Sequence, residues 1–165
     1  MKTTDKFLIG IVAGVVLLVG VAFAVAFLRP KPTYQPDDIP EDVAHNYLLA
    51  LKQEDYARAY GYLSPGIRSY PDSAEAFAED VADNRWNFGG GDDSVTLEIE
   101  SVRMTGEDRA VVSVRERRFY QGGLFDSGKY TSTFDMTLRR RNDRWQIFES
   151  DSYWAWCWDD AKGCR

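Results

Sequence analysis

The sequence predicts an α+β protein that carries an N-terminal transmembrane helix. Residues 7–28 form a run of 22 residues without a charged side chain. From about residue 40 to about residue 83, apolar side chains recur at the 3.6-residue spacing of helices, and from Ser94 onward they alternate with polar ones, as in strands. Helices followed by a series of strands are typical of an α+β domain whose helices cover one face of an antiparallel sheet.

The apolar run follows a short N-terminal tail, residues 1–6, and is long enough to cross a membrane. As a helix it measures about 33 Å, against about 30 Å for the hydrocarbon core of a bilayer. A cleaved secretory signal is the alternative, because Ala24-Val25-Ala26 offers a small-residue cleavage site. Signals have a shorter apolar region of about 7–15 residues, so we favour a retained anchor that attaches the protein to the membrane through residues 7–28.

The part of the chain after the apolar run is acidic. Of the 20 basic and 26 acidic residues, only Lys2, Lys6 and Asp5 precede residue 29. The remainder therefore holds 18 basic and 25 acidic residues, a net charge of −7 with His45 neutral. Nucleic-acid backbones attract clustered Lys and Arg, so the charge argues against nucleic-acid binding.

Two cysteines near the C-terminus, Cys157 and Cys164, indicate the compartment. A closely spaced pair at a chain end is typical of a disulfide, which forms in oxidising compartments. Two unrelated free thiols are the alternative. The basic residues that flank the apolar run balance each other and leave the orientation open. We therefore expect a single-pass protein of the cell membrane, with a cytoplasmic N-terminus and an extracytoplasmic C-terminal domain.

Residues 29–40 form a Pro-rich linker, and the domain is expected to follow at 41–158. Four prolines make the linker a stiff, extended spacer. Asp37 or Asp38 is expected to cap the first helix, with Pro40 in its first turn. The apolar positions of this helix are Val43, Ala44, Tyr47, Leu48 and Leu51.

Two shorter helices are expected next, one from Tyr56 that ends at Ser64-Pro65-Gly66 and one over about 73–83. Four strands follow, beginning near Val95, Ala110, Tyr130 and Trp145. Asn142-Asp143 fits a two-residue hairpin loop between the last two strands. Residues 159–165 then form a C-terminal tail that the disulfide closes.

The segment EDVAHNYLLALKQEDYARAYGYLSP (Glu41–Pro65), followed by a helix and a long sheet, resembles small extracytoplasmic NTF2-like domains of unknown function that are anchored to membranes. The resemblance covers about Val43–Trp156. It is carried by Tyr47, Leu48, Leu51, Asp55, Tyr56, Ala59, Tyr60, Leu63, Ser64 and Pro65. These positions pack a helical hairpin and hold no chemistry. The resemblance implies a cone in which three helices pack on a curved four-stranded antiparallel sheet, often with a pocket, but the fold alone does not define a function.

Polar side chains on the core-facing phase of the strands predict a candidate pocket. If the Asn142-Asp143 loop sets the pairing, Leu138 lies opposite Ile147 and Met136 opposite Glu149. The inner face then turns polar at one end, where we expect Glu116, Arg118, Ser132, Glu149 and Asp151 to gather, with Arg118 facing Glu149 or Asp151. Paired carboxylates could perform acid–base chemistry there. Two alternatives are a structural salt-bridge network around Arg118, and a bulge near Phe148 that turns the acids outward and Phe148, Trp154 and Trp156 inward.

The aromatic run near the C-terminus is a second candidate site. Strand alternation would place Trp154, Trp156 and Trp158 on one face. They are expected either to belong to the core or to form an exposed patch for a partner or the lipid interface.

Motifs for catalysis and metal binding are weak in this sequence. There is no Gly-x-Ser-x-Gly elbow, and Glu41 and His45 read as a solvated first helical turn. The arginine stretches 115–118 and 139–144 read as solvated strand residues that pair with neighbouring acids, because they fall near opposite ends of the sheet. We therefore expect no catalytic residues, no metal and no cofactor.

Taken together, these features favour a non-enzymatic membrane protein that presents an NTF2-like domain for protein or small-ligand binding. A protein partner in or near the membrane is expected. One alternative is an accessory subunit of a larger membrane complex, since the layout also resembles the bitopic inner-membrane component of type IV secretion machines. A second alternative is an isomerase or hydratase of the cone-pocket type.

Overall fold

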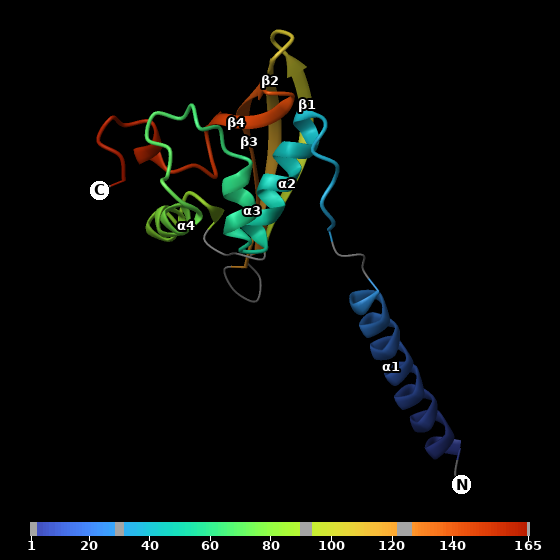
Figure 1. Ribbon diagram of the computed structural model, residues 1–165. Coiled ribbons are helices and arrows are strands. Elements are labelled where there is room, and N and C mark those ends of the chain that lie inside the picture. The colour runs from blue at the N-terminus through green and yellow to red at the C-terminus, as the bar shows by residue number, and fades with distance from the viewer. Residues whose placement is uncertain (1–2, 29–31, 90–93, 122–126, 165) are drawn as a thin grey trace. The chain divides into compact units, whose positions relative to one another are not determined.

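The computed structural model describes residues 3–28, 32–89, 94–121 and 127–164. The chain divides into two compact units, residues 1–33 and 34–165. The first unit contains helix α1 (Thr3–Phe27), drawn in blue in Figure 1. Its stretch Leu8–Val25 has a mean hydropathy of 2.9 and no buried side chain, so it is long and apolar enough to cross a membrane. The helix begins at Thr3, so it includes part of the tail expected at residues 1–6.

The second unit, called the domain below, contains the three expected helices. These are α2 (Pro40–Lys52), α3 (Tyr56–Gly61) and α4 (Ala74–Asp83). Asp55 and Ser73 cap α3 and α4 by accepting hydrogen bonds from backbone amides of the first turn. The cap expected for α2 from Asp37 or Asp38 is wrong, because Ile39 occupies that position without a side-chain hydrogen bond.

The second half of the expected linker is attached to the domain. The buried Asn46 side chain accepts from the Gln35 amide at 2.8 Å and donates to the Gln35 carbonyl at 2.8 Å and to Asp37 at 2.7 Å. The Arg58 guanidinium lies 3.5 Å from the ring centroid of Tyr34. The domain therefore begins at Tyr34 rather than at residue 41, while residues 29–31 of the expected linker 29–40 lie outside the described part of the chain.

Four antiparallel strands form the sheet in the order β1-β2-β3-β4. They are β1 (Val95–Met104), β2 (Arg109–Gln121), β3 (Ser127–Arg141) and β4 (Arg144–Ser150). Asn142 and Asp143 form the expected two-residue loop, with φ values of 51° and 59°. Positive φ at both loop residues is characteristic of the type I′ turn, whose twist matches that of the strands. The predicted α+β class is therefore confirmed.

The core lies between the helices and the inner face of the sheet. Figure 1 shows α2 and α3 in front of the strands, and α2 contacts β1, β2 and β4. Apart from Ser150 at the end of β4, the buried strand residues are those of the expected inward phase, and they pack against apolar residues of α2. They include Val112, Val114, Met136, Leu138 and Ile147.

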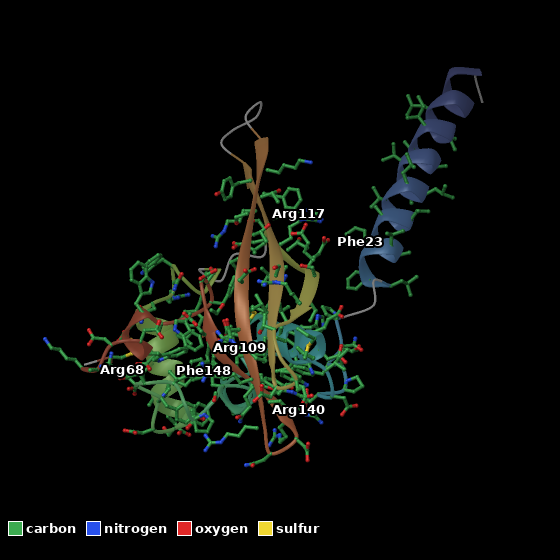
Figure 2. All side chains as sticks on the ribbon, turned by 90° about the horizontal axis from the view of Figure 1, so that it is seen from above. Phe23, Arg68, Arg109, Arg117, Arg140 and Phe148 are labelled. Carbon is green, nitrogen blue, oxygen red and sulfur yellow. A yellow bond between two sulfur atoms is a disulfide. The ribbon has the colours of Figure 1, made fainter. Side chains whose placement is uncertain are left out.

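The outer face of the sheet is polar. Arg115 pairs with Glu100, and Arg117 pairs with Glu98 at 2.8 Å. Figure 2 shows Arg117 toward one end of the sheet and Arg140 toward the other. The two arginine stretches therefore do not combine into one basic patch, as their positions in the sequence indicated.

A short 3-10 helix, η2 (Trp156–Trp158), follows β4 and contains one cysteine of the expected disulfide. Cys157 and Cys164 are bonded, with their Cα atoms 4.7 Å apart. The amide of Ser69 donates to the Trp158 carbonyl at 3.0 Å, and the Ser69 hydroxyl donates to the Asp160 carbonyl. The tail is thus held to the loop between α3 and α4 as well as closed on itself.

Candidate functional site

The five residues expected to form a pocket divide between the two faces of the sheet. Glu116 is buried on the inner face, and Ser132 lies opposite it on β3, half-buried. Glu149 and Asp151 are exposed. The prediction that Arg118 faces Glu149 or Asp151 is therefore wrong.

A β-bulge at Phe148 is the physical reason for this difference. Leu138 pairs with Ile147 as expected, but Thr137 pairs with Glu149, so Phe148 has no partner on β3. The extra residue shifts the register by one, which exchanges the two faces for every later residue. Ser150 consequently takes the place opposite Met136 that the regular pairing gives to Glu149.

Phe148 itself does not turn into the core. Its ring is half-buried and lies 3.5 Å from the guanidinium carbon of Arg139. A Cβ atom added to Gly66 would come within 3.3 Å of the same ring. Of the residues that the bulge alternative turned inward, only Trp154 is buried, while Trp156 is exposed.

Arg118 pairs with Glu116, two residues earlier on the same strand. The Glu116 side chain is 6% exposed and the Arg118 side chain 38%, so the carboxylate is buried while its partner reaches solvent. Of the predicted pocket, the structure therefore brings together Glu116, Arg118 and Ser132. The salt-bridge alternative describes this group, with Glu116 rather than Glu149 or Asp151 as the partner.

A cavity of about 330 Å³ lies between the helices and β1. The apolar part of its walls is formed by Leu48, Leu51, Val81, Phe88, Val95 and Leu97. Polar groups are contributed by Lys52, Glu54, Tyr56, Arg85 and Tyr153. An apolar concave site with a few polar groups is the usual form of a small-molecule site, and this volume falls at the small end of the range.

Tyr153 is the most unusual residue of this cavity. It is 4% exposed and has φ of 56°, a left-handed conformation that a bulky residue seldom adopts. Among the residues that the structure describes, none meets hydrogen-bond geometry with its buried hydroxyl, although the Glu116 carboxylate lies nearby. Most buried polar atoms are satisfied, so this hydroxyl, on a residue that lines the cavity, is a candidate donor to a ligand atom.

The backbone around Tyr153 is firmly held. The Tyr47 hydroxyl donates to the Tyr153 carbonyl at 2.7 Å, and the Tyr153 amide donates to the Asn87 carbonyl at 3.0 Å. Gly89 has φ of 82°, and a Cβ atom there would lie 3.1 Å from the Tyr153 hydroxyl oxygen. Both the conformation and the close approach therefore require glycine at position 89.

The Tyr153 hydroxyl is neutral at physiological pH. Burial raises its pKa far above the usual value, and the nearby Glu116 carboxylate raises it further, while Arg118 opposes the effect. A neutral phenol can donate a hydrogen bond, so Tyr153 can act as a donor to an oxygen acceptor.

The three tryptophans expected on one face do not share one. Trp154 and Trp158 are buried in the core, whereas Trp156 is 67% exposed and contacts the exposed Trp86. The 3-10 helix is the reason, because three residues per turn replace the two-residue alternation of a strand. The core expectation is confirmed for two of the three.

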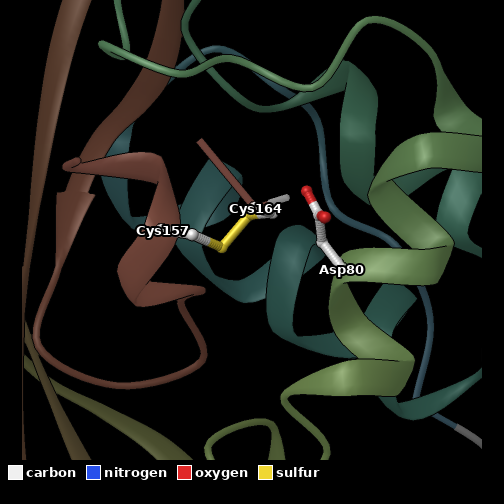
Figure 3. A group of neighbouring side chains, drawn as sticks. All are labelled: Asp80, Cys157 and Cys164. Carbon is white, nitrogen blue, oxygen red and sulfur yellow. A yellow bond between two sulfur atoms is a disulfide. The ribbon is translucent and has the colours of Figure 1, made fainter. Parts of the chain in front are cut away.

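Asp80 and the two cysteines form a close group that Figure 3 shows between α4 and the C-terminal segment. Their potential ligand atoms lie within 4.8 Å of one another. The two sulfur atoms are bonded to each other and therefore offer no thiolate to a metal. Asp80 instead accepts a hydrogen bond from the Trp158 indole at 2.7 Å, and burial raises the pKa of its carboxyl group.

Sequence reasoning missed the cavity residues Tyr153 and Gly89. Tyr153 follows the bulged end of β4, and only its conformation distinguishes it from other core aromatics. Gly89 opens a glycine-rich segment that reads as a connector. Neither residue type carries a spacing signal that points to a binding site.

Neither a protein-family model nor a curated protein matches the chain. Solved structures similar to it include an NTF-2-like protein of unknown function from Shewanella oneidensis, with 14% identity and a TM-score of 0.45. That match covers 66% of this chain and 90% of the other. A ketosteroid isomerase-like protein from Erwinia carotovora atroseptica has 19% identity and a TM-score of 0.44, covering 67% and 88%. An NTF2-like protein with a cystatin-like fold from Novosphingobium aromaticivorans has 13% identity and a TM-score of 0.43, covering 67% and 75%.

Proposed function

We propose that this chain is a membrane-anchored, extracytoplasmic, NTF2-like binding protein without catalytic activity, and that its domain takes up a small, largely apolar molecule. The observation that carries the proposal is a cavity that combines apolar walls with a few polar groups, and that is lined by Tyr153, whose buried hydroxyl has no partner by hydrogen-bond geometry. A ligand with an oxygen acceptor would satisfy this donor while its apolar body fills the space between α2, α4 and β1.

The charges of the cavity favour an anionic group on the ligand. Lys52 and Arg85 contribute two cations to the lining and Glu54 one carboxylate. The Lys52 ammonium donates to the Val95 carbonyl at 3.2 Å, which holds it beside the wall of the cavity. A small aromatic carboxylate combines the apolar body, the acceptor oxygen and the charge that these groups select.

A binding role is favoured over catalysis by the arrangement of the carboxylates. Acid–base catalysis by a carboxylate pair needs both groups at one reacting centre. Glu149 and Asp151 are exposed beyond the bulge, so Glu116 alone of the three predicted acids is buried, and Arg118 neutralises it.

Naphthalene-2-carboxylate is a suitable probe for the cavity. The full chain in phospholipid nanodiscs, with methyl groups labelled for NMR, should show shifts at Leu48, Leu51, Val81 and Leu97 on titration. Tyr153→Phe should weaken binding about tenfold, the value of a hydrogen bond to a charged group. It should leave the unfolding temperature unchanged or raise it, because the variant removes an unsatisfied buried hydroxyl.

Naphthalene serves as the matched control ligand because it lacks the carboxylate. Its affinity should be the same for the parent protein and for Tyr153→Phe. Shifts confined to residues outside the cavity, or equal carboxylate affinity in both proteins, would contradict a cavity site with Tyr153 as donor.

The proposed anchor is supported by the length and hydropathy of α1, and the extracytoplasmic location by the disulfide. Protein extracted from membranes is therefore expected to have the intact mass of the whole chain. A mature protein that starts at Phe27, after the small residues Ala24-Val25-Ala26, would show that the helix is a cleaved signal instead.

A further inference from the structure

Two tryptophans from distant parts of the sequence lie side by side on the domain surface. Trp86 follows α4 and is 66% exposed, and Trp156 begins η2 and is 67% exposed. Their ring centroids are 5.9 Å apart, with the ring planes inclined by 52°. Burial of a tryptophan is strongly favourable, so two adjacent exposed rings indicate an interaction surface.

The backbones that carry this pair are fixed to each other. Asn87 follows Trp86 in the sequence, and its side chain donates to the carbonyl of Trp154, two residues before Trp156. The disulfide closes the segment that begins at Cys157, and the Trp158 indole is bonded to Asp80 of α4. The backbone positions of the two tryptophans are therefore fixed before any partner arrives, which lowers the entropic cost of binding.

The two segments that carry the pair are acidic. Residues 73–89 and 154–164 contain six acidic side chains and two basic ones, a net charge of −4. Five of the six acids are exposed, namely Glu75, Glu79, Asp83, Asp159 and Asp160. The C-terminal end of α4 adds the partial negative charge of its carbonyl groups close to Trp86.

Aromatic faces within a negative potential attract cations. A guanidinium or ammonium group placed over a tryptophan face gains from the ring quadrupole, and nearby carboxylates add Coulombic attraction. Anionic lipid headgroups would be repelled by the same charges. We infer that Trp86 and Trp156, with the acids around them, form a docking site for an Arg- or Lys-rich segment of a partner protein.

The inference is independent of the ligand cavity and is tested with a defined peptide. The full chain in phosphatidylcholine nanodiscs is titrated with an acetylated, fluorescent hexa-arginine peptide, and binding is followed by anisotropy. Trp86→Ala and Trp156→Ala should each weaken binding about fivefold or more. Trp86→Leu should weaken it as well, because leucine keeps apolar surface but has no π face.

Matched charge variants separate this site from general attraction to an acidic domain. Asp83→Asn with Asp160→Asn should weaken peptide binding clearly more than Glu98→Gln with Glu100→Gln, which removes the same charge from the outer face of the sheet. Tyr130→Ala, at a residue 61% exposed on β3, is the control for loss of an exposed aromatic ring and should leave binding unchanged. Unchanged unfolding temperatures confirm that each variant is folded.

Five results would overturn the inference, four of them in the peptide titrations. The first is no peptide binding up to about 1 mM, where even weak specific contacts are measurable. The second and third are an affinity equal to that of the parent protein in Trp86→Ala and Trp156→Ala, and full retention of binding in Trp86→Leu. The fourth is an equal loss of affinity in the two pairs of charge variants. Quenching of tryptophan fluorescence by brominated lipids that disappears in Trp86→Phe with Trp156→Phe would assign the pair to the bilayer instead, and would also overturn it.

Discussion

Replacing Trp158 with alanine is expected to lower the free energy of unfolding by about 4 kcal/mol, the largest effect of any single substitution proposed for this domain. Trp158 is fully buried. Its ring stacks on Phe77 with centroids 5.4 Å apart and meets the edge of Trp154 at 4.8 Å. The truncation leaves a cavity between these rings, and it also removes the indole donor at 2.7 Å from Asp80.

Trp156→Ala is the control for this experiment, since it changes the same residue type two positions earlier on the same 3-10 helix. Its side chain is mostly exposed, so the loss should be about 0.5 kcal/mol or less. Urea-induced unfolding of the full chain in mild detergent, followed by near-ultraviolet circular dichroism, measures both variants. Equal losses would mean that the two rings share one environment, as regular strand alternation implies.

The arrangement of secondary structure could be predicted from the sequence because it depends on local patterns. Helical spacing in α2 and α4, and alternation in β1 and β2, follow from which side chains must be buried. The loop at Asn142-Asp143 was also predictable, since these residues tolerate the positive φ that a two-residue hairpin needs.

The division of the five predicted pocket residues between the two faces of the sheet could not be predicted, because it depends on a register change. The segment around Phe148 has the same apolar and polar alternation with or without a bulge, and the extra residue decides which face the later side chains occupy. On the other side of β4, Ile147 bonds to the chain around Leu63, through its amide to Tyr62 and its carbonyl to Ser64. These contacts join segments far apart in the sequence, so no local pattern reveals them.

The same limit applies to the binding cavity and to the exposed tryptophan pair. Tyr153 lines the cavity only because the chain turns with positive φ after β4. Trp86 and Trp156 meet because Asn87 binds the backbone at Trp154. Both features arise where two distant segments come together, whereas the sequence shows each segment separately.

Replacing Arg118 with alanine is expected to lower the free energy of unfolding by about 2 kcal/mol. The substitution leaves the Glu116 carboxylate buried on the inner face without its counter-ion. Breaking a fully buried ion pair costs more than this, but the Arg118 side chain is 38% exposed, and solvent screens part of the interaction. The loss should be largely relieved by a second substitution, Glu116→Gln, which removes the uncompensated charge.

Arg117→Ala is the matched control, because Arg117 is the adjacent residue and its side chain is similarly exposed at 35%. Its partner Glu98 lies on the outer face and is 46% exposed, so this variant should lose about 0.5 kcal/mol. The two variants thus differ in the free energy of unfolding that they lose because the partner carboxylate is buried in one case and exposed in the other, while the two arginines are similarly exposed. Urea unfolding of the two single variants, Glu116→Gln and the Arg118→Ala/Glu116→Gln double variant gives the coupling energy directly. Two results would contradict this prediction: additive losses in the double variant, or equal losses at positions 117 and 118. Either would show that the buried Glu116 carboxylate does not need Arg118 as a counter-ion. The ion pair beside Tyr153 would then contribute nothing to stability.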